Sequence, residues 1–321
     1  MDSINIACTC DNGYCQHFAA LMASVYENNR LNDICFYLVT NFIDKTNKEK
    51  LDILAKKYGK KIQFYIVDEK RFKGLPYGGK FPHISIASYF RLLLSEVLPI
   101  NISKVLYLDC DIIVMDNLKD LWETDLTDVA LAGMEDCTLM TKLGPSRLGY
   151  PSDYSYFNAG VLLLNLDYLR KINFVGMFAE YVVLNYDKIL YHDQDILNAL
   201  LFNKKRFLPV KWNVMDCFMF RRPLIDRKYL SDLKKAKMSP SIIHYSGRRK
   251  PWYKECTHPY RDLYWKYLLL TEYGKEQPQM LFTTKFSKLS YKIKIIVKWI
   301  VDYLHMDSYL YDSHIPQNRR I

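Results

Sequence analysis

The residues of this chain with the clearest chemical potential are two aspartates one residue apart, Asp109 and Asp111. They interrupt an apolar run over residues 104–115, a pattern typical of a buried parallel strand with an acidic end. Because side chains alternate along a strand, the i, i+2 spacing predicts both carboxylates on one face. Two carboxylates held so close repel each other unless a cation or a shared proton lies between them. The stretch therefore predicts a divalent metal site, with turn chemistry at a strand end as the alternative.

A second group of chemically capable side chains lies toward the carboxyl end. An apolar strand expected over residues 241–244 ends in His244, and Gly247 follows shortly after. Gly247 allows a close backbone approach, and the cations at positions 248–250 could neutralise an anionic leaving group. The stretch therefore indicates a corner that binds an anion, with a simple hydrogen-bonding role for His244 as the alternative.

Polar groups also accompany other expected elements. The first strand, over residues 4–9, is followed by Asp11 and Asn12, and ligands of open α/β sheets bind beyond the carboxyl ends of strands. Both residues are site candidates, although a plain Asp-Asn-Gly turn fits them equally. Arg91 lies in an apolar helix expected over residues 82–94. A buried arginine needs an anionic partner, which a phosphate or a structural carboxylate would supply equally.

Amide and acidic groups gather in the middle of the chain. One expected strand leads to Asp136, and the next strand opens with Asn158. The helix that follows begins with Asp193, Gln194 and Asp195. Carboxylates at a helix start cap the helix and suit its dipole, but this role explains one of the two aspartates and not the whole cluster.

The elements that must position these residues alternate between strands and helices. Strands are expected over residues 34–39 and 62–67, with a charged helix over residues 45–58 between them. This alternation predicts an α/β fold with a mostly parallel sheet covered by helices. A long loop, of the kind that often forms a lid, is expected over residues 138–156, and an extended segment over residues 207–213. No G-x-G-x-x-G motif follows the first strand, which disfavours a dinucleotide-dependent oxidoreductase.

Composition limits these expectations further. With 321 residues, half of them hydrophobic, the chain can form one large domain with an appendage. We expect no signal peptide, and no run of about 18 apolar residues predicts a membrane span. Eight scattered cysteines indicate reduced thiols in a cytosol, and Cys8, Cys10 and Cys15 lack the usual spacing of zinc ligands. The net charge of +10 suggests an anionic partner.

The composition changes near residue 276, which divides the chain into a main domain, residues 1–275, and a tail, residues 276–321. Lysines border an apolar helical face in the tail, a pattern typical of a helix in an anionic membrane interface. Docking on the domain or on another protomer is the alternative. Because the cations gather in the tail and near residue 250, without a stripe of base-stacking aromatics, nucleic acid is disfavoured as a partner. The apolar face comprises Leu289, Ile293, Ile296, Val297, Ile300 and Leu304.

Four stretches, in this order along the chain, resemble the pattern of glycosyltransferase family 8. The resemblance covers residues 4–252 and is closest to bacterial lipopolysaccharide α-galactosyltransferases of the LgtC type. It implies a GT-A fold for the main domain, a Rossmann-like mixed and mostly parallel sheet flanked by helices, followed by the helical tail. The stretches are Leu106-Tyr-Leu-Asp-Cys-Asp-Ile-Ile-Val114, Tyr156-Phe-Asn-Ala-Gly-Val-Leu-Leu-Leu-Asn165, Asp193-Gln-Asp-Ile-Leu-Asn198 and His244-Tyr-x-Gly-x-x-Lys-Pro-Trp252.

The resemblance implies an activity and a location. The enzyme would transfer galactose or glucose, with retention, from a UDP-sugar to a glycan or glycolipid acceptor in lipopolysaccharide, lipooligosaccharide or capsule synthesis. It would use Mn²⁺, with Mg²⁺ as a possible substitute. The protein would be cytoplasmic and attached peripherally, through its tail, to the anionic inner face of the cell membrane.

The resemblance also implies roles for individual residues. Asp109, Asp111 and His244 match the metal ligands, and Gln194 and Asp193 match the catalytic positions beside the donor sugar. The first loop carries one more residue than the family pattern, and Arg248 and Arg249 lie outside that pattern. The donor-binding residues implied in this way are Ala7, Thr9, Asp11, Asn12, Arg91, Asp109, Cys110, Asp136, Asn158, Ala159, His244, Gly247 and Lys250.

The expected chemistry agrees with these residue types. Departure of a diphosphate places growing negative charge on the leaving phosphate, which a metal and nearby cations stabilise. Oxygen ligands suit Mg²⁺ or Mn²⁺, and one imidazole favours Mn²⁺. A double displacement would need a carboxylate nucleophile, but Gln194 stands at that position. We therefore expect a front-face substitution in which the leaving phosphate accepts the acceptor's proton and Gln194 or Asp193 steadies the cationic sugar.

Two other functions were weighed against this expectation. A phosphatase of the haloacid dehalogenase type also carries Asp-x-Asp after an apolar strand, but near the start of its domain, and it gives no reason for His244 or Lys250. A catalytically silent module that binds a sugar nucleotide or a glycan would carry the same residues. Tight binding of Mn²⁺ and donor without hydrolysis or transfer would favour that module.

Overall fold

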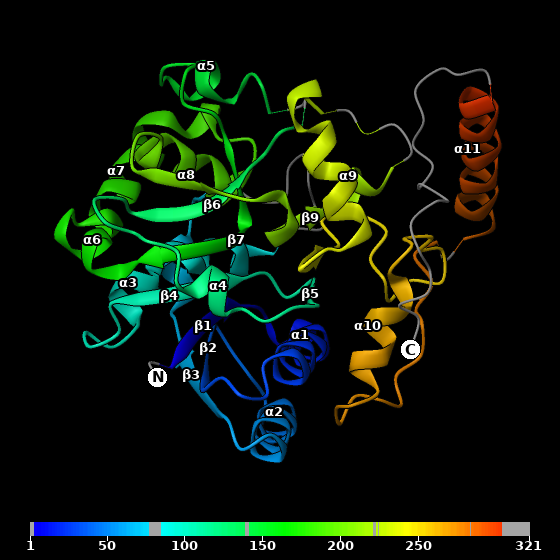
Figure 1. Ribbon diagram of the computed structural model, residues 1–321, viewed down its shortest axis with the longest axis horizontal. Helices are drawn as coiled ribbons and strands as arrows, with labels where there is room; N and C mark the ends of the chain where they lie inside the picture. The colour runs from blue at the N-terminus through cyan, green and yellow to red at the C-terminus, as the bar shows by residue number, and fades with distance from the viewer. Residues whose placement is uncertain are drawn as a thin grey trace.

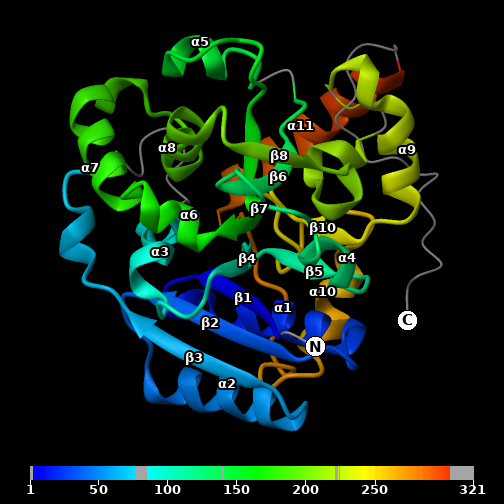
Figure 2. The same ribbon diagram turned by 60° about the vertical axis from the view of Figure 1, so that its left-hand side comes forward.

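The computed structural model describes residues 3–76, 85–138, 141–220, 223, 225–282 and 284–303. At its centre is a seven-stranded sheet of order β3-β2-β1-β4-β7-β6-β8, next to a three-stranded sheet of order β5-β10-β9 (Figures 1 and 2). The large sheet contains β1 (Ile4–Thr9), β2 (Ile34–Thr40), β3 (Lys61–Ile66), β4 (Lys104–Leu108), β6 (Leu131–Glu135), β7 (Phe157–Asn165) and β8 (Lys205–Leu208). The small sheet contains β5 (Ile112–Val114), β9 (Val214–Met215) and β10 (Ile242–His244).

The large sheet is mixed, with mostly parallel neighbours. Strand β1 runs parallel to β2 and β4, β2 to β3, and β6 to β8, whereas β7 is antiparallel to both β4 and β6. In the small sheet, β10 is antiparallel to β5 and parallel to β9. The parallel order brings the carboxyl ends of β1 and β4 to one edge, where the polar loops after these strands meet.

Helices cover both faces of the large sheet, because side chains alternate along each strand. In β1, Ile4, Ile6 and Cys8 belong to a core shared with α1 and α10, whereas Ala7 belongs to a core shared with α7 and α8. The helices are α1 (Cys15–Asn28), α2 (Lys45–Lys57), α3 (Leu94–Val97), α4 (Lys119–Trp122), α5 (Gly144–Leu148), α6 (Leu166–Lys171), α7 (Phe174–Asn185), α8 (His192–Leu201), α9 (Leu230–Met238), α10 (Arg261–Leu268) and α11 (Lys285–Tyr303).

The helix expected over residues 82–94 is largely a 3-10 helix. It extends over Ile86–Leu93 and becomes α-helical only in α3, while residues 82–84 lie outside the described part of the chain. The Ser85 side chain accepts a hydrogen bond from the Ala87 N–H and caps the start. With three residues per turn, the tighter coil places Ser85, Ser88 and Arg91 on one side, and all three line the same cavity.

Two further expectations needed correction. The segment 207–213 is extended only as far as Leu208, the end of β8, and continues as a 3-10 helix over Val210–Trp212. Pro209 lies at this break and has no N–H to continue the strand ladder. The loop expected over residues 138–156 contains a short helix, α5, which Gly149 ends in the left-handed region at φ 84°.

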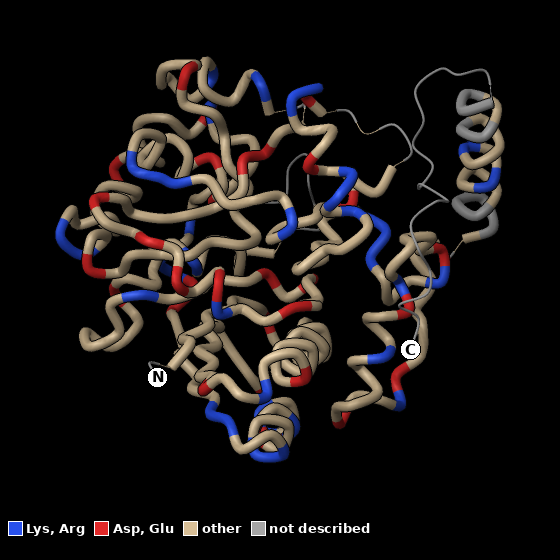
Figure 3. Tube along the Cα trace, in the orientation of Figure 1, with Lys and Arg blue, Asp and Glu red and all other residues tan. Residues whose placement is uncertain are grey.

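Helix α11 lies to one side of the main body (Figure 1). Its apolar side chains are exposed: Ile293 and Ile296 are 52% and 57% exposed, and Leu289, Val297 and Ile300 are exposed as well. Lysine positions lie among uncharged ones along the helix (Figure 3). Tyr291 connects the helix to the main body through a hydrogen bond from its hydroxyl to the Glu255 carbonyl. Leu304 and the residues after it lie outside the described part of the chain.

Candidate active site

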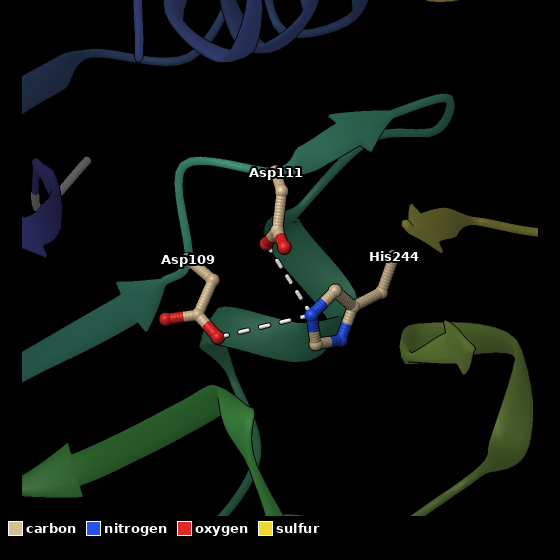
Figure 4. A group of neighbouring side chains, drawn as sticks. All are labelled: Asp109, Asp111 and His244. Atoms are coloured by element: carbon tan, nitrogen blue, oxygen red, sulfur yellow. Dashed lines mark ion pairs between the residues drawn. The ribbon is translucent and has the colours of Figure 1, made fainter. Parts of the chain in front are cut away.

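Three predicted metal ligands come together at the edge where the two sheets meet. The single strand expected over residues 104–115 is instead two strands of different sheets, and the turn between them carries both aspartates: Asp109 follows β4 and Asp111 precedes β5. His244 ends β10, which pairs with β5 through His244 and Ile112. The Nε2 atom of His244 lies 3.3 Å from Asp111 Oδ1 and 3.8 Å from Asp109 Oδ2 (Figure 4). One ligand atom of each residue lies within 4.8 Å of the other two. This arrangement fits a single metal ion with two oxygen ligands and one nitrogen ligand.

The electrostatics of Asp111 also fit a cation. Its Oδ1 atom is buried and accepts no hydrogen bond within the described part of the chain. Burial alone would raise the pKa of Asp111, but Lys250 and His244 beside it lower that pKa well below its usual range. The carboxylate is therefore charged, and an unsatisfied buried carboxylate oxygen costs free energy unless a cation or a donor meets it.

Lys250 neutralises the other oxygen of Asp111. Its ammonium group lies 2.5 Å from Asp111 Oδ2 and donates a hydrogen bond to the Tyr245 carbonyl. Lys250 lines the same cavity as the two aspartates, as does the exposed cation Arg248. Lys250 and Arg248 thus add positive charge to the cavity, which would favour an anionic ligand.

Arg91 connects Asp109 to the start of α8. Its guanidinium group lies 2.9 Å from Asp109 Oδ1 and 2.9 Å from Asp193 Oδ2, and it donates a hydrogen bond to the Ala159 carbonyl. Burial alone would lower the pKa of Arg91, but the two carboxylates raise it above its usual range. Of the two anionic partners expected for a buried Arg91, a phosphate or a carboxylate, the protein itself supplies carboxylates. Arg91 nevertheless lines the cavity. Burial raises the pKa of Asp193 to about 6.

Amide groups line the same cavity. The Oε1 atom of Gln194 accepts hydrogen bonds from the Ala159 N–H and from Asn158 Nδ2, at 2.9 Å and 3.1 Å. Asp195, by contrast, is fully buried and binds Arg147 through both carboxylate oxygens. Asp195 Oδ2 also accepts the N–H groups of the two residues before α8, so that Asp195 performs the capping role expected for one of the aspartates.

Most of the predicted site residues line one cavity of about 650 Å³, a size typical of ligand sites. Cys110 belongs to its wall and donates a weak hydrogen bond to the Thr9 carbonyl. Asp11 lines the wall as well, while its side chain accepts the Gly13 N–H. The predicted residues at this cavity are Thr9, Asp11, Arg91, Asp109, Cys110, Asp111, Asn158, Ala159, Asp193, Gln194, His244 and Lys250.

Four predicted donor-binding residues do not line this cavity. Ala7 is fully buried in β1, and the side chain of Asn12 bonds with Asp44 and Asn47 at the start of α2. Asp136 lines a smaller neighbouring cavity and accepts a hydrogen bond from the Thr138 hydroxyl. Gly247 packs so closely on Asp216 that a Cβ atom would lie 2.3 Å from its Oδ2. Their roles in donor binding stay predictions.

Several residues at the cavity were not singled out from the sequence. The serines at positions 85 and 88 could have been found from their three-residue spacing to Arg91, had a 3-10 helix been expected. Tyr14, Tyr191 and Ser246 carried no signal of this kind. The unpredicted lining residues are Cys10, Tyr14, Ser85, Ala87, Ser88, Gly160, Tyr191, His192 and Ser246.

The fold and the site together define a class of protein. An α/β sheet carries a carboxylate and imidazole cluster at its carboxyl edge, in a cavity that cations, amide groups and further carboxyl groups also line. Such a set of side chains can hold a divalent cation and an anionic ligand in one cavity. The family model described as Glycosyl transferase family 8 matches residues 5–256, and the chain therefore belongs to this family.

The relatives and solved structures agree with this assignment. General stress protein A of Bacillus subtilis is 26% identical, over 84% of this chain and 95% of the relative. A lipopolysaccharide 1,2-glucosyltransferase of Escherichia coli is 28% identical, over 82% of this chain and 77% of the relative. The galactosyltransferase LgtC, solved with donor and acceptor sugar analogs, is 30% identical with a TM-score of 0.75, over 84% of this chain and 96% of LgtC. The predicted GT-A fold, the family and the assignment as a glycosyltransferase are thereby confirmed.

A membrane-spanning segment was also sought. Within the part of the chain that the structure describes, every helix is too short or too polar to cross a bilayer.

Proposed function

We propose that this enzyme transfers a hexose, galactose or glucose, from a UDP-sugar to a glycan or glycolipid acceptor with retention of anomeric configuration. One observation carries the proposal: the Asp109, Asp111 and His244 cluster lines the same cavity as Lys250, Arg91 and Gln194. The cluster and Lys250 suit a metal diphosphate, and Arg91 and Gln194 suit sugar hydroxyls. The similarity to LgtC and to the Escherichia coli glucosyltransferase supports a hexose donor.

A divalent metal would be held by Asp109, Asp111 and His244, with Mn²⁺ favoured over Mg²⁺ because one ligand is an imidazole. When bound, the metal would supply positive charge to the leaving diphosphate. Lys250 and Arg248 add protein charge in the same cavity, without donating a proton to the leaving oxygen. Asp11 would contact the uridine end, and Asn158, Asp193 and the amide of Gln194 would orient the sugar.

Asp193 and Asp195 are poorly placed to act as nucleophiles. Asp195 is fully buried and held by Arg147, and Asp193 is paired with Arg91. Gln194 already uses its Oε1 atom to accept two hydrogen bonds. These contacts support a front-face substitution over a covalent intermediate.

In this substitution the acceptor hydroxyl oxygen forms a bond to the anomeric carbon on the face that the diphosphate leaves. The bond from that carbon to the β-phosphate oxygen breaks, and its electron pair departs with UDP. The hydroxyl proton passes to a phosphate oxygen of the leaving group. Gln194 and Asp193 would stabilise the positive charge that develops on the sugar.

The test is UDP release from a panel of UDP-sugars with and without Mn²⁺. We expect release from UDP-galactose or UDP-glucose that depends on the metal, and a loss of about 100-fold or more in Asp111→Asn, as for other electrostatic groups at active sites. Unchanged activity in Asp111→Asn would refute the metal assignment. A covalent glycosyl adduct trapped on Asp193 or Asp195 would refute the front-face mechanism.

The acceptor and the location follow the same proposal. The Escherichia coli relative, a lipopolysaccharide glucosyltransferase, supports an acceptor in lipopolysaccharide synthesis, with lipooligosaccharide or capsule synthesis as the alternatives. The enzyme would be cytoplasmic and attached peripherally to the inner face of the cell membrane. Residues 1–275 would form the catalytic domain, and residues 276–321 the attachment tail, because α11 exposes apolar side chains beside the lysines at positions 292 and 294.

A further inference from the structure

A buried asparagine that does not line the cavity lies directly behind the metal cluster. Asn213 is fully buried between a 3-10 helix and β9, and its carboxamide lies between two site residues. Its Oδ1 atom is 2.9 Å from His244 Nδ1, and its Nδ2 atom is 2.8 Å from Asn158 Oδ1. In Figure 4 this ring nitrogen, Nδ1, is turned away from the aspartates, whereas Nε2 faces them.

Backbone N–H groups, which can only donate, determine the direction of these hydrogen bonds. The Gly160 N–H donates to Asn158 Oδ1, which identifies that atom as the carbonyl oxygen of the amide. The Ala159 N–H likewise identifies Gln194 Oε1, so that Asn158 Nδ2 donates to Gln194. Because Asn158 Oδ1 is an acceptor, the neighbouring atom of Asn213 must be its NH₂ group.

The tautomer of the His244 ring follows from the orientation of the Asn213 amide. With the NH₂ group of Asn213 on Asn158, its carbonyl oxygen faces His244 Nδ1, which must carry the proton. The Nε2 atom of the neutral ring then presents its lone pair toward Asp109 and Asp111. The opposite tautomer would point an N–H at the two carboxylates, and such a ring could not ligate a cation.

We propose that Asn213 is a positioning residue, which holds His244 in the Nδ1-protonated tautomer and links it through Asn158 to Gln194. The inference rests on the proposed function, because it assigns His244 as a metal ligand. Through this network the metal end and the sugar end of the cavity share one set of buried hydrogen bonds. The partners of metal-bound histidines act in this way, and their loss commonly lowers metal affinity 10- to 100-fold.

The first experiment compares Mn²⁺ affinity, measured from the electron paramagnetic resonance of free Mn²⁺ in the presence of UDP. Asn213→Leu, which removes both hydrogen bonds, is expected to weaken affinity about 10- to 100-fold. Asn213→Asp, which keeps an acceptor for Nδ1–H but places a second acceptor against Asn158 Oδ1, is expected to lose less affinity than Asn213→Leu. The control is Asn29→Leu, a substitution of an equally buried asparagine that bonds Val25, Asp116 and Leu118 instead. Unchanged affinity in Asn213→Leu, or an equal loss in Asn29→Leu, would overturn the proposal.

The second experiment requires no variant of Asn213 to fold. In nitrogen-15 spectra of the metal-free wild-type protein, with the signal assigned by its absence in His244→Gln, the His244 ring is expected to be protonated at Nδ1. Protonation at Nε2 alone, with Nδ1 unprotonated, would refute the positioning role. A wild-type protein that binds no Mn²⁺ with UDP, or binds it as tightly after Asp111→Asn, would instead refute the proposed metal site.

Discussion

The ammonium group of Lys250 lies 2.5 Å from Oδ2 of Asp111, a carboxylate whose other oxygen faces His244. One carboxylate thus connects the protein's own cation with the proposed metal position. We predict that Lys250→Met lowers turnover about 100- to 1,000-fold, because it removes positive charge from the leaving diphosphate. Mn²⁺ affinity, in contrast, should be equal to or higher than in the wild type, because a competing cation is lost. UDP release and Mn²⁺ titration measure the two effects separately.

Lys254→Met is a suitable control for this prediction, since it removes a lysine four residues away that does not line the cavity. It should leave both turnover and Mn²⁺ affinity near the wild-type values. If Lys250→Met keeps its turnover, Lys250 does not stabilise the leaving group. If it loses Mn²⁺ affinity, Lys250 supports the metal site instead of competing with it.

Position 160 has no room for a Cβ atom, because side chains of the metal cluster occupy that space. A Cβ atom at this position would lie 2.3 Å from His244 Cε1 and 2.9 Å from Asp109 Oδ2. We predict that Gly160→Ala displaces these ligands and weakens Mn²⁺ binding at least about 10-fold, as misplaced metal ligands usually do. Isothermal titration with Mn²⁺ and UDP would measure the change.

Gly13→Ala provides a control for added bulk, because its Cβ atom would meet its nearest neighbour, Asp11 Oδ1, at an ordinary 3.4 Å. It should leave Mn²⁺ affinity unchanged. Full Mn²⁺ affinity in Gly160→Ala would show that the cluster of Asp109 and His244 does not hold the metal.

The residues that the sequence revealed are those whose type and local spacing carry information. Asp109 and Asp111 lie one residue apart in the turn between β4 and β5, and His244 ends β10, which pairs with β5, so that the three side chains reach the same edge. Most of the fold was predictable for the same reason, because strands and helices alternate with distinct periods. The reversed direction of β7 was not predictable from local sequence, because strand pairing depends on contacts between distant segments.

Residues that act through long-range contacts escaped prediction. Asn213 is a single asparagine between apolar neighbours, and its meaning comes from hydrogen bonds to residues 55 positions before it and 31 positions after it. Asn12 gives the opposite case. Its place after the first strand suggested a ligand, but Asp44 and Asn47, which begin α2, occupy its side chain.

Two buried histidines should make the fold sensitive to acid. Burial lowers the pKa of His17 to about 3 and that of His258 to about 4, below the ordinary value of 6.5. The unfolded chain therefore binds protons that the folded chain does not, so that stability is complete above pH 6.5 and falls as the pH decreases toward 3. Each histidine should cost about 2 kcal/mol of unfolding free energy between pH 6.5 and pH 5.

Urea unfolding at several pH values, with EDTA present, would measure this effect. In His17→Gln, whose side chain can still bond the Tyr264 hydroxyl, the decrease below pH 6.5 should be smaller than in the wild type. Loss of the stacking of His17 on Trp252 should lower stability equally at all pH values, which separates packing from protonation. An unchanged pH dependence in His17→Gln would show that His17 titrates normally in the folded protein.

Membrane attachment through α11 can be tested by adding charge to its apolar face. Ile293 and Ile296 lie one turn apart and are 52% and 57% exposed. We predict that Ile293→Asp with Ile296→Asp reduces sedimentation with phosphatidylglycerol vesicles at least about 10-fold, because both apolar insertion and attraction to anionic lipid are lost. Leu31→Asp with Ile100→Asp adds the same charge at exposed apolar positions outside α11 and should sediment like the wild type. Equal sedimentation of all three proteins would assign the apolar face to docking on another protein surface. Activity on a water-soluble acceptor should be unchanged in both variants.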